Sequence, residues 1–346
     1  MPRDMTEQLK KEVEAIRRLR EMDGQEFTGT LEYTTPEADD IIPVSTFRHG
    51  GVNKCLVPEL SFAEEAELHR LVLKAGDRLL DNRDYQLDAE HRELNERLEI
   101  RAETGSDSEL IFAYRDSGEV TVKRQTDLHI EVAPGAKLMI FLLQQMSPLA
   151  ASRMKIHCLL EPESELRLVI ADSGAGSHAL DLKTELDTRS LFDCQSIYFG
   201  RGQEKYDYNY HLIHHGQLAQ SKLQVNGALM DHAEKVFRGT IDFRRGSSGS
   251  VGDESEYVTL LDDTVRSRAI PLLLSGEDNV EGNHAASAGR LDPAMVFYVQ
   301  SRGFNRREAE KMIIASRFSN VLDILPNSEL KDSVLKDILE KLDSAK

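Results

Sequence analysis

The chain has 346 residues, a formal net charge of −17 at pH 7, 40% hydrophobic residues and no tryptophan. A chain of this length can bury a large core, as one elongated domain or as two ordinary ones. The acidic charge argues against binding to a nucleic-acid backbone, which requires a cationic surface. The longest apolar run, at 138–143, is far shorter than the ~20 residues of a membrane-spanning helix, so we expect neither nucleic acid nor a membrane as a partner.

The first 125 residues are predicted to mix helices with exposed segments. No apolar signal core precedes a small-residue cleavage site near the N-terminus, so we expect a cytoplasmic protein. Apolar residues at helical spacing predict a first amphipathic helix there: Met5, Leu9, Val13 and Ile16. A second helix is expected to begin at the capping box of Ser61 and Glu64, and the polar segment Asp81–Glu96 is predicted to be an exposed loop or a loosely held helix.

Residues 126–291 contain short runs in which apolar and polar residues alternate, with turn residues between the runs. Alternation with a period of two is typical of a strand with one buried face. The runs lie at 128–132, 138–143, 154–158, 166–170, 180–182, 192–199, 206–213, 223–225, 236–243 and 257–261. No helical stretch separates them, which disfavours a sheet built from strand–helix–strand units.

A turn followed by an alternating strand recurs at a spacing of about 20–30 residues, which suits the coils of a parallel β-helix. Ala133–Leu138 and Glu161–Leu166 are the clearest pair. In a β-helix each coil buries its inward side chains on the next coil. A β-sandwich or jelly roll gives a similar pattern, so the pattern alone leaves both architectures open.

Residues 292–346 are predicted to be helical. Asp292 and Pro293 are typical of an N-cap followed by proline at the first helical position, and Asn305 with Glu308 predicts a capping box for a second helix. A final helix carries a wide apolar stripe: Leu330, Val334, Leu335, Ile338, Leu339 and Leu342. We expect this stripe to pack on the core or to meet a partner.

Three segments of the C-terminal half carry a family resemblance. They are GALMDHAEKVFRGTIDFRRGSSGS (Gly227–Ser250), AIPLLLSGEDNVEGNHAASAGRLD (Ala269–Asp292) and MVFYVQSRGFNRREAEKMIIASRF (Met295–Phe318). In order, spacing and character they resemble the segments VFxGxIxV, PxLxI…DVxxxHxAxxGxxD and FYLxSRGI…A of the SufB/SufD family of iron–sulfur cluster assembly proteins. The resemblance extends from His211 to Phe318; the strand-rich middle agrees only in pattern, and the first 120 or so residues hardly agree.

The resemblance implies a mainly β fold, a right-handed parallel β-helix with helical segments at both ends. The mixed N-terminal region would be 1–125, the β-helix core 126–291 and the C-terminal helical region 292–346. The chain would be a scaffold and not an enzyme. It would dimerise through the β-helix with a second SufB/SufD-type subunit, the same or a sister chain, and bind a SufC-like ABC ATPase through its C-terminal region. A transient iron–sulfur cluster would form at the dimer interface, and ATP would be used only by the partner.

His284 matches the interface histidine of the family, and a neutral imidazole is a competent iron ligand. Glu281, three residues earlier, could ligate from the same loop. The structural alternatives are a histidine hydrogen-bonded at a strand end and a solvated carboxylate. Arg266 stands where B-type members carry an essential cysteine, and arginine cannot ligate iron. The chain would then be a D-type partner that lends His284 to the cluster, or a subunit of a minimal system that ligates iron differently.

The three cysteines are isolated in the sequence, because none belongs to a CxxC or CxxxC pair: Cys55, Cys158 and Cys194. This pattern argues against a disulfide framework and against a zinc site built from thiolates. Cys194 and Cys158 lie in predicted strands and could relay sulfur as persulfide through the β-helix. Buried structural cysteines are the alternative.

Phe297, Tyr298 and Arg302 are predicted to dock the ATPase, because these residue types are enriched in protein interfaces. The two aromatic residues could instead cap the open end of the β-helix. The glycine-rich loop Gly246–Gly252 lacks the lysine of a phosphate-binding loop and is predicted to be a β-turn.

The cluster His211, His214 and His215 suggests a metal site at first sight. The alternating tyrosines before it predict a strand, however, with His211 and His215 on one face and His214 on the other. Two histidines without a third ligand make a weak site, so we favour a role in surface or inter-coil stacking.

Two other functions remain open from the sequence. A β-helix polysaccharide lyase or hydrolase would need aromatic residues along a sugar groove and a pair of acids, but only 6% of the residues are aromatic and no acid pair can be named. A structural partner that positions the ATPase without ligating iron is the other possibility, which Arg266 supports.

Overall fold

The computed structural model describes residues 56–76 and 80–343, with the backbone alone at residues 80 and 81. All of the described residues belong to one compact unit, Leu56–Lys346. The first predicted helix, at Met5–Ile16, and Cys55 therefore lie outside the described residues.

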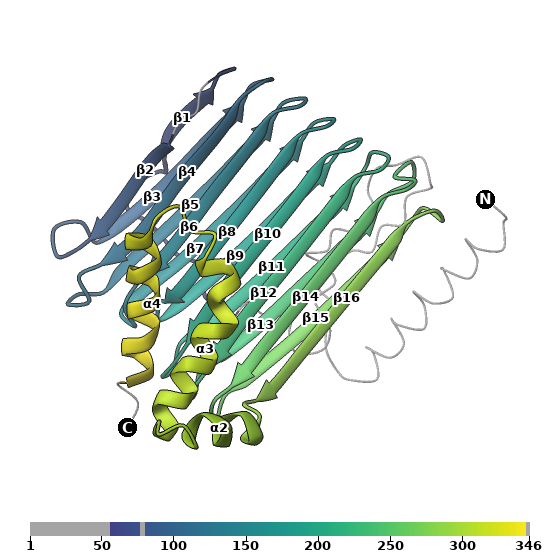
Figure 1. Ribbon diagram of the computed structural model, residues 1–346. Coiled ribbons are helices and arrows are strands. Elements are labelled where there is room, and N and C mark those ends of the chain that lie inside the picture. The colour runs from purple at the N-terminus through teal and green to yellow at the C-terminus, as the bar shows by residue number, and fades with distance from the viewer. Residues whose placement is uncertain (1–55, 77–79, 344–346) are drawn as a thin grey trace, which may run out of the picture. The chain divides into compact units, whose positions relative to one another are not determined.

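The described residues contain sixteen strands, which form two eight-stranded sheets in which every pairing is parallel. Odd-numbered strands make sheet A, in the order β1-β3-β5-β7-β9-β11-β13-β15, and even-numbered strands make sheet B (Figure 1). The chain thus alternates between the sheets, and each odd–even pair makes one coil of a solenoid. This arrangement confirms the parallel β-helix and excludes an antiparallel sandwich.

The strands have the following bounds: β1 (Glu67–Leu73), β2 (Leu80–Leu87), β3 (Glu93–Ala102), β4 (Asp107–Asp116), β5 (Val122–Val132), β6 (Lys137–Gln145), β7 (Ala150–Leu160), β8 (Glu165–Gly174), β9 (Ser177–Leu186), β10 (Leu191–Gly200), β11 (Lys205–His214), β12 (Gln220–Leu229), β13 (Glu234–Phe243), β14 (Val251–Leu260), β15 (Arg266–Ser275) and β16 (Glu281–Arg290). Three helices follow: α2 (Pro293–Gln300), α3 (Arg306–Leu322) and α4 (Ser328–Asp343).

The interior core lies between the two sheets and continues from coil to coil. Neighbouring strands stack in register, so that Leu98, Leu128, Ile156 and Leu182 form one ladder across β3, β5, β7 and β9. In β5 every second residue is buried, as period-two alternation predicts. Each coil therefore stabilises its neighbours by burying apolar surface.

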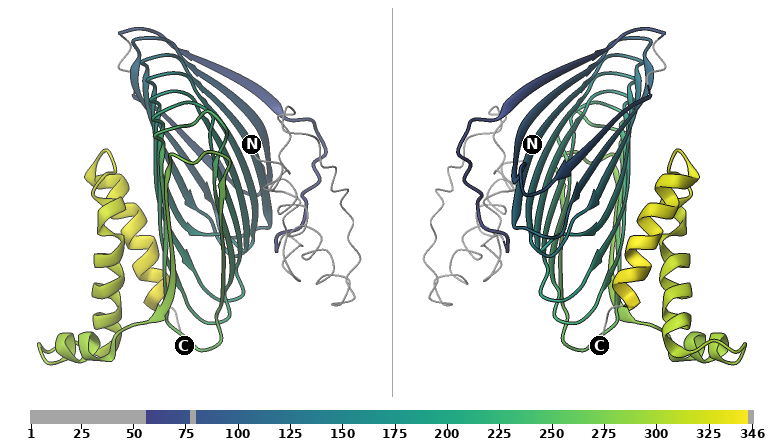
Figure 2. Two further views of the ribbon diagram at one scale, coloured as in Figure 1. Left: turned by 90° about the vertical axis from the view of Figure 1, so that its right-hand side faces the viewer. Right: turned by 90° about the vertical axis from the view of Figure 1, so that its left-hand side faces the viewer.

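A second core covers the outer face of sheet B, where α3 and α4 pack (Figure 2). Strand residues such as Phe141 and Phe199 contact helix residues such as Phe318 and Ile338. Strands buried on both faces are continuously apolar, which explains the run at 138–143 in β6. The apolar stripe of the last helix thus packs on the core.

The predicted helix starts are confirmed. The Asp292 side chain accepts a hydrogen bond from the backbone N–H of Ala294, with Pro293 in the first turn of α2. Asn305 and Glu308 form both hydrogen bonds of a capping box at the start of α3. Caps of this kind satisfy backbone N–H groups that have no partner within the helix.

Two predictions for the N-terminal region were wrong. The helix expected after Ser61 is replaced by a short irregular segment and by β1, whose Leu71 and Leu73 lie in register with Ile100 and Ala102 of β3. The polar segment 81–96 is mostly part of β2 and β3 and not a loop or helix. The solenoid therefore begins at β1, well before residue 126. These segments are strands because they pair with the next coil, and a local sequence pattern does not show such pairing.

We predict that Phe318→Ala destabilises the chain by about 3–5 kcal/mol, because it removes a fully buried ring from the contact between α3 and sheet B. Met312→Ala is the matched control, since Met312 lies in the same helix but is 48% exposed, and it should cost under about 1 kcal/mol. Urea unfolding measures both. Equal losses for the two variants would contradict the packing described here.

Candidate functional site

The last coil of the solenoid is an open end. Among residues 56–76 and 80–343, β15 pairs only with β13 and β16 pairs only with β14, so both are edge strands. Every residue of β16 except Gly282 is exposed. The inward residues of this coil are therefore accessible, whereas those of the preceding coils are buried.

His284 lies in β16 on the inner face of sheet B. It is in register with Glu254 of β14, and Glu281 is in register with Val251. Because successive strand residues point to opposite faces, His284 shares the inner face with buried Glu254, while Glu281 points outward. The two residues lie in a strand and not in the expected loop, and this strand directs them apart.

Beneath His284 is a buried charged cluster that the sequence analysis did not identify. The ammonium Nζ of Lys235 in β13 lies 2.5 Å from Oε1 of Glu256 in β14, and both side chains are almost fully buried. Glu256 also accepts a hydrogen bond from the hydroxyl of Tyr198, at 3.2 Å. The available signal was that Glu254 and Glu256 alternate with the outward residues of a strand, so that both occupy core positions.

Glu254 differs from Glu256 in having no hydrogen bond or ion pair from the described residues, and its Oε2 is buried without a partner. Burial, together with the nearby Glu256 carboxylate, raises the pKa of Glu254 to about 8. Burial also raises the pKa of Glu256, and Lys235 opposes that rise. The cluster thus combines two carboxyl groups with one ammonium group in a site of low polarity.

The two described cysteines lie in the apolar interior, several coils from the open end. Cys158 in β7 and Cys194 in β10 are both fully buried. Burial raises the pKa of the Cys158 thiol to about 12 and that of Cys194 well above its usual value. Since the thiolate is the reactive form, this environment favours the structural role over sulfur relay.

The histidine cluster divides as the strand pattern predicts. His214 points inward, is fully buried and donates to or accepts from the Ser221 hydroxyl at 2.8 Å. His211 and His215 point outward, and His215 contacts Glu185 at 3.1 Å. His157 contacts the same carboxylate at 3.0 Å, and these hydrogen bonds lower the pKa of Glu185. Among residues 56–76 and 80–343, no three His, Cys, Asp or Glu side chains are arranged to hold a metal ion.

Arg266, at the start of β15, is largely exposed and lies 3.6 Å from the carboxylate of Glu234. It pairs in register with Glu234, whose neighbour Lys235 points inward, so Arg266 is on the outer face. The position that resembles the B-type cysteine position thus carries a surface ion pair, and it does not join His284 on the inner face.

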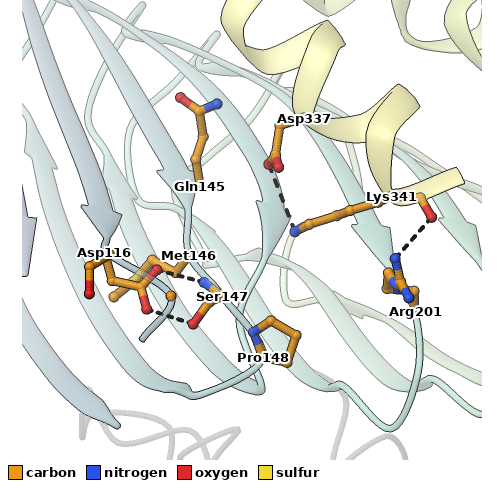
Figure 3. Close-up of a pocket in the computed structure, with 10 residues that line it drawn as sticks. Asp116, Gln145, Met146, Ser147, Pro148, Arg201, Asp337 and Lys341 are labelled. Atoms are coloured by element: carbon orange, nitrogen blue, oxygen red, sulfur yellow. Dashed lines mark hydrogen bonds and ion pairs between the residues drawn. The ribbon is translucent and has the colours of Figure 1, made fainter. Parts of the chain in front are cut away.

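A cavity of about 330 Å³ lies where α4 meets the turns of the solenoid (Figure 3). Lys341 of α4 donates to the carbonyl of Ser173, and Arg201 donates to the carbonyl of Lys341 at 3.1 Å. Asp337 accepts from the Ser173 hydroxyl, and Asp116 accepts from the Ser147 backbone at 2.7 Å. The contacts of Lys341, Arg201 and Asp337 attach α4 to the solenoid, whereas that of Asp116 joins two neighbouring coils.

The predicted docking residues are presented at α2. Phe297 is 71% exposed and Tyr298 is 59% exposed, so neither seals the end of the solenoid within the described chain. The guanidinium of Arg302 lies 5.1 Å from the Tyr298 ring and donates to its hydroxyl at 3.1 Å. The residues thus form a contiguous exposed surface.

Residues 85–317 match the family described as SUF system FeS cluster assembly, SufBD core domain. The chain belongs to the SufB/SufD family. The match begins far upstream of the three segments that carry the resemblance, and it includes nearly all coils of the solenoid. Membership places the chain among proteins of iron–sulfur cluster assembly.

Three relatives illustrate the similarity. The chain is 31% identical to the iron–sulfur cluster assembly protein SufD of Bacillus subtilis over 150 residues, which is 43% of this chain and 34% of the relative. It is 28% identical to SufD of Escherichia coli over 131 residues, 38% of this chain and 31% of the relative. It is 25% identical to the chloroplastic protein ABCI7 of Arabidopsis thaliana over 209 residues, 59% and 44% of the two chains. The SufBD chain thus aligns with less than half the length of these relatives.

No helix within the described parts of this SufBD chain is long and apolar enough to cross a membrane. The cytoplasmic location stays a prediction from the sequence.

We predict that Glu254→Gln changes the pH dependence of stability. The folded chain favours the neutral carboxyl, because its pKa is about 8 against a usual 4.5. The stability that the neutral Glu254 carboxyl contributes is therefore fully present below the usual pKa of 4.5, and it is lost as the pH rises from there through 8. The urea-unfolding free energy of the variant, relative to wild type, should rise by up to about 1.4 kcal/mol per pH unit across this window.

The charged or titratable groups that face Glu254 are Glu256, Lys235 and His284, and they are retained in this comparison. Glu281→Gln is the control, since it removes an exposed carboxylate from the outer face of β16, and its profile should follow wild type. Parallel pH profiles for Glu254→Gln and wild type would show that the Glu254 carboxyl does not cause the pH dependence of stability.

Proposed function

We propose that this chain is a scaffold subunit for iron–sulfur cluster assembly, and not an enzyme. Its open end would pair with a second SufB/SufD-type subunit, the same or a sister chain, and a transient cluster would form at that interface. The observation that carries the proposal is the position of His284, exposed on the inner face of the last strand. Edge strands present unpaired backbone groups that can pair with another chain.

The positions of the possible iron ligands support the role of a SufD-type subunit. His284 is exposed, but Arg266 lies on the outer face and the described thiols are buried in the interior. Thiolate ligands for the cluster would therefore come from the partner subunit, and this chain would contribute an imidazole. Sulfur relay through Cys158 and Cys194 would require exposure of both thiols, which their burial disfavours.

A SufC-like ABC ATPase would bind at the surface formed by Phe297, Tyr298 and Arg302. This surface is attached to the solenoid through α3, which packs on sheet B, and through β16, which leads directly into α2. ATP-driven closure of two bound ATPase subunits would move both solenoids and open or close the interface at His284. Such coupling is a population shift driven by differential affinity for nucleotide.

A second candidate is a structural subunit that binds the ATPase without ligating iron. Glu281 points outward, and an arginine stands at position 266, on the outer face. Of the ligands that the sequence predicted at the open end, His284 alone lies on the inner face, and this favours the structural role. No observation among the described residues favours a carbohydrate-active enzyme.

We predict that His284→Ala reduces cluster assembly about tenfold or more, since loss of even an outer-shell partner typically costs 10–100-fold in metal affinity. The measurement is anaerobic reconstitution of the chain with its second subunit and ATPase, followed by visible absorbance and Mössbauer spectroscopy. His215→Ala is the matched control, because it removes an exposed histidine from the outer face of sheet A. Unchanged assembly by His284→Ala would favour the structural candidate.

We predict that Arg302→Glu weakens ATPase binding by about 1–2 kcal/mol or more, because it places a negative charge beside two exposed aromatic rings. Lys336→Glu on the exposed side of α4 is the control of equal charge change. Calorimetry or co-purification with the ATPase distinguishes the two variants. Retained binding by Arg302→Glu would move the docking surface elsewhere.

A further inference from the structure

Glu254 is the carboxylate that the fold places beside His284. β14 and β16 pair in parallel and in register, and these two residues are direct partners on the inner face of sheet B. Backbones of paired strands are about 4.8 Å apart, so an imidazole and a carboxylate project side by side toward the interior of the solenoid. Glu281 projects from the opposite face.

The Glu254 side chain is built into the interior but is left without a partner. It is 4% exposed, and its Oε2 contacts no donor in the described chain. Gly239 of the facing sheet makes the space, because a Cβ there would lie 2.0 Å from Oε1 and 2.3 Å from Oε2 of Glu254. A buried carboxylate oxygen without a donor is costly, and a bound cation would satisfy it.

Charge balance also favours a cation. Glu254 and Glu256 face a single ammonium group, and Lys235 is engaged by Glu256. When both carboxyl groups of the cluster are ionised, one of them therefore has no counter-ion within the described chain. Carboxylate oxygen and imidazole nitrogen are both suitable ligands for ferrous iron.

The cover over this carboxylate is thin. Besides His284, the inward residues of β16 are small: Gly282, Ala286 and Ala288. Those of β15 are Ser267, Ala269, Pro271, Leu273 and Ser275, and Pro271 lies in register with Gly239. All of them are exposed or half-buried. An ion that binds His284 at the open end can therefore approach Glu254 along β16, where the inward neighbours of His284 are Gly282 and Ala286.

We infer that Glu254 and His284 together bind a ferrous ion as the two ligands that this chain contributes, with the remaining positions filled by water or by the partner subunit. The inference rests on the proposed function and assigns the second ligand of the same site. The second ligand is then Glu254, from the preceding coil, and not Glu281 as the sequence predicted.

The test uses Co²⁺ as a spectroscopic substitute for Fe²⁺, on the full chain under anaerobic conditions. All variants carry His215→Ala, because His157, Glu185 and His215 could otherwise bind the probe on the outer face of sheet A. Titration followed by the visible ligand-field bands gives the affinity. Glu254→Gln should weaken Co²⁺ binding at least tenfold and change the bands, as should His284→Ala, whereas Glu281→Gln should stay within about twofold of the parent.

The outcomes separate this inference from the proposed function. Loss of binding in His284→Ala but not in Glu254→Gln overturns the inference alone. Loss in Glu254→Gln but not in His284→Ala overturns the role of His284. A parent chain that does not bind Co²⁺ overturns both. Circular dichroism and urea unfolding check the fold of each variant; if Glu254→Gln does not fold, Glu254→Asp, which keeps the charge but shortens the side chain, is titrated with the same criteria.

Discussion

The in-register stacking of one coil on the next is the constraint on which the rest of the structure depends. Each inward side chain lies on its counterpart in the neighbouring coil, as in the ladder from Leu98 to Leu182. A coil is stable because it is covered on both sides, and within the part of the chain that the structure describes the last coil is covered on one side only. The same regularity that builds the core thus creates, at this end of the solenoid, a surface where inward-facing groups, including His284, are accessible.

The difference between the two sheets decides where partners can act. The second halves of β4, β6, β8 and β10 in sheet B are apolar on both faces, and α3 and α4 cover the outer face there. The outer face of sheet A carries ion pairs and histidines such as His157 and His215. A protein that binds at α2 would therefore be connected through packed side chains to sheet B, the sheet that holds both Glu254 and His284. Movement of the helices and of the open end would then be coupled mechanically.

The sequence predicted most of the fold but only part of the site. Period-two alternation identified the central strands, and side-chain chemistry identified the caps at Asp292 and Asn305. It failed at Ser61 and at 81–96, because these polar or mixed segments become strands only by pairing with the coils that follow. His284 was recognised by its motif. Glu254 was not, because its significance depends on register with a strand 30 residues away, which no local pattern contains.

Other buried ionisable side chains of the solenoid indicate how unusual Glu254 is. Arg124 is fully buried, yet it donates to Thr126, Gln144 and Ser152 and lies 3.9 Å from the centre of the Tyr114 ring. Glu96 and Glu204 also keep one oxygen without a partner, but each accepts two hydrogen bonds through the other oxygen. The interior therefore accommodates charge where neighbouring coils supply donors. Glu254 lies one coil from the open end, where the last coil supplies no donor to it, so a ligand from outside is the natural source of its missing partner.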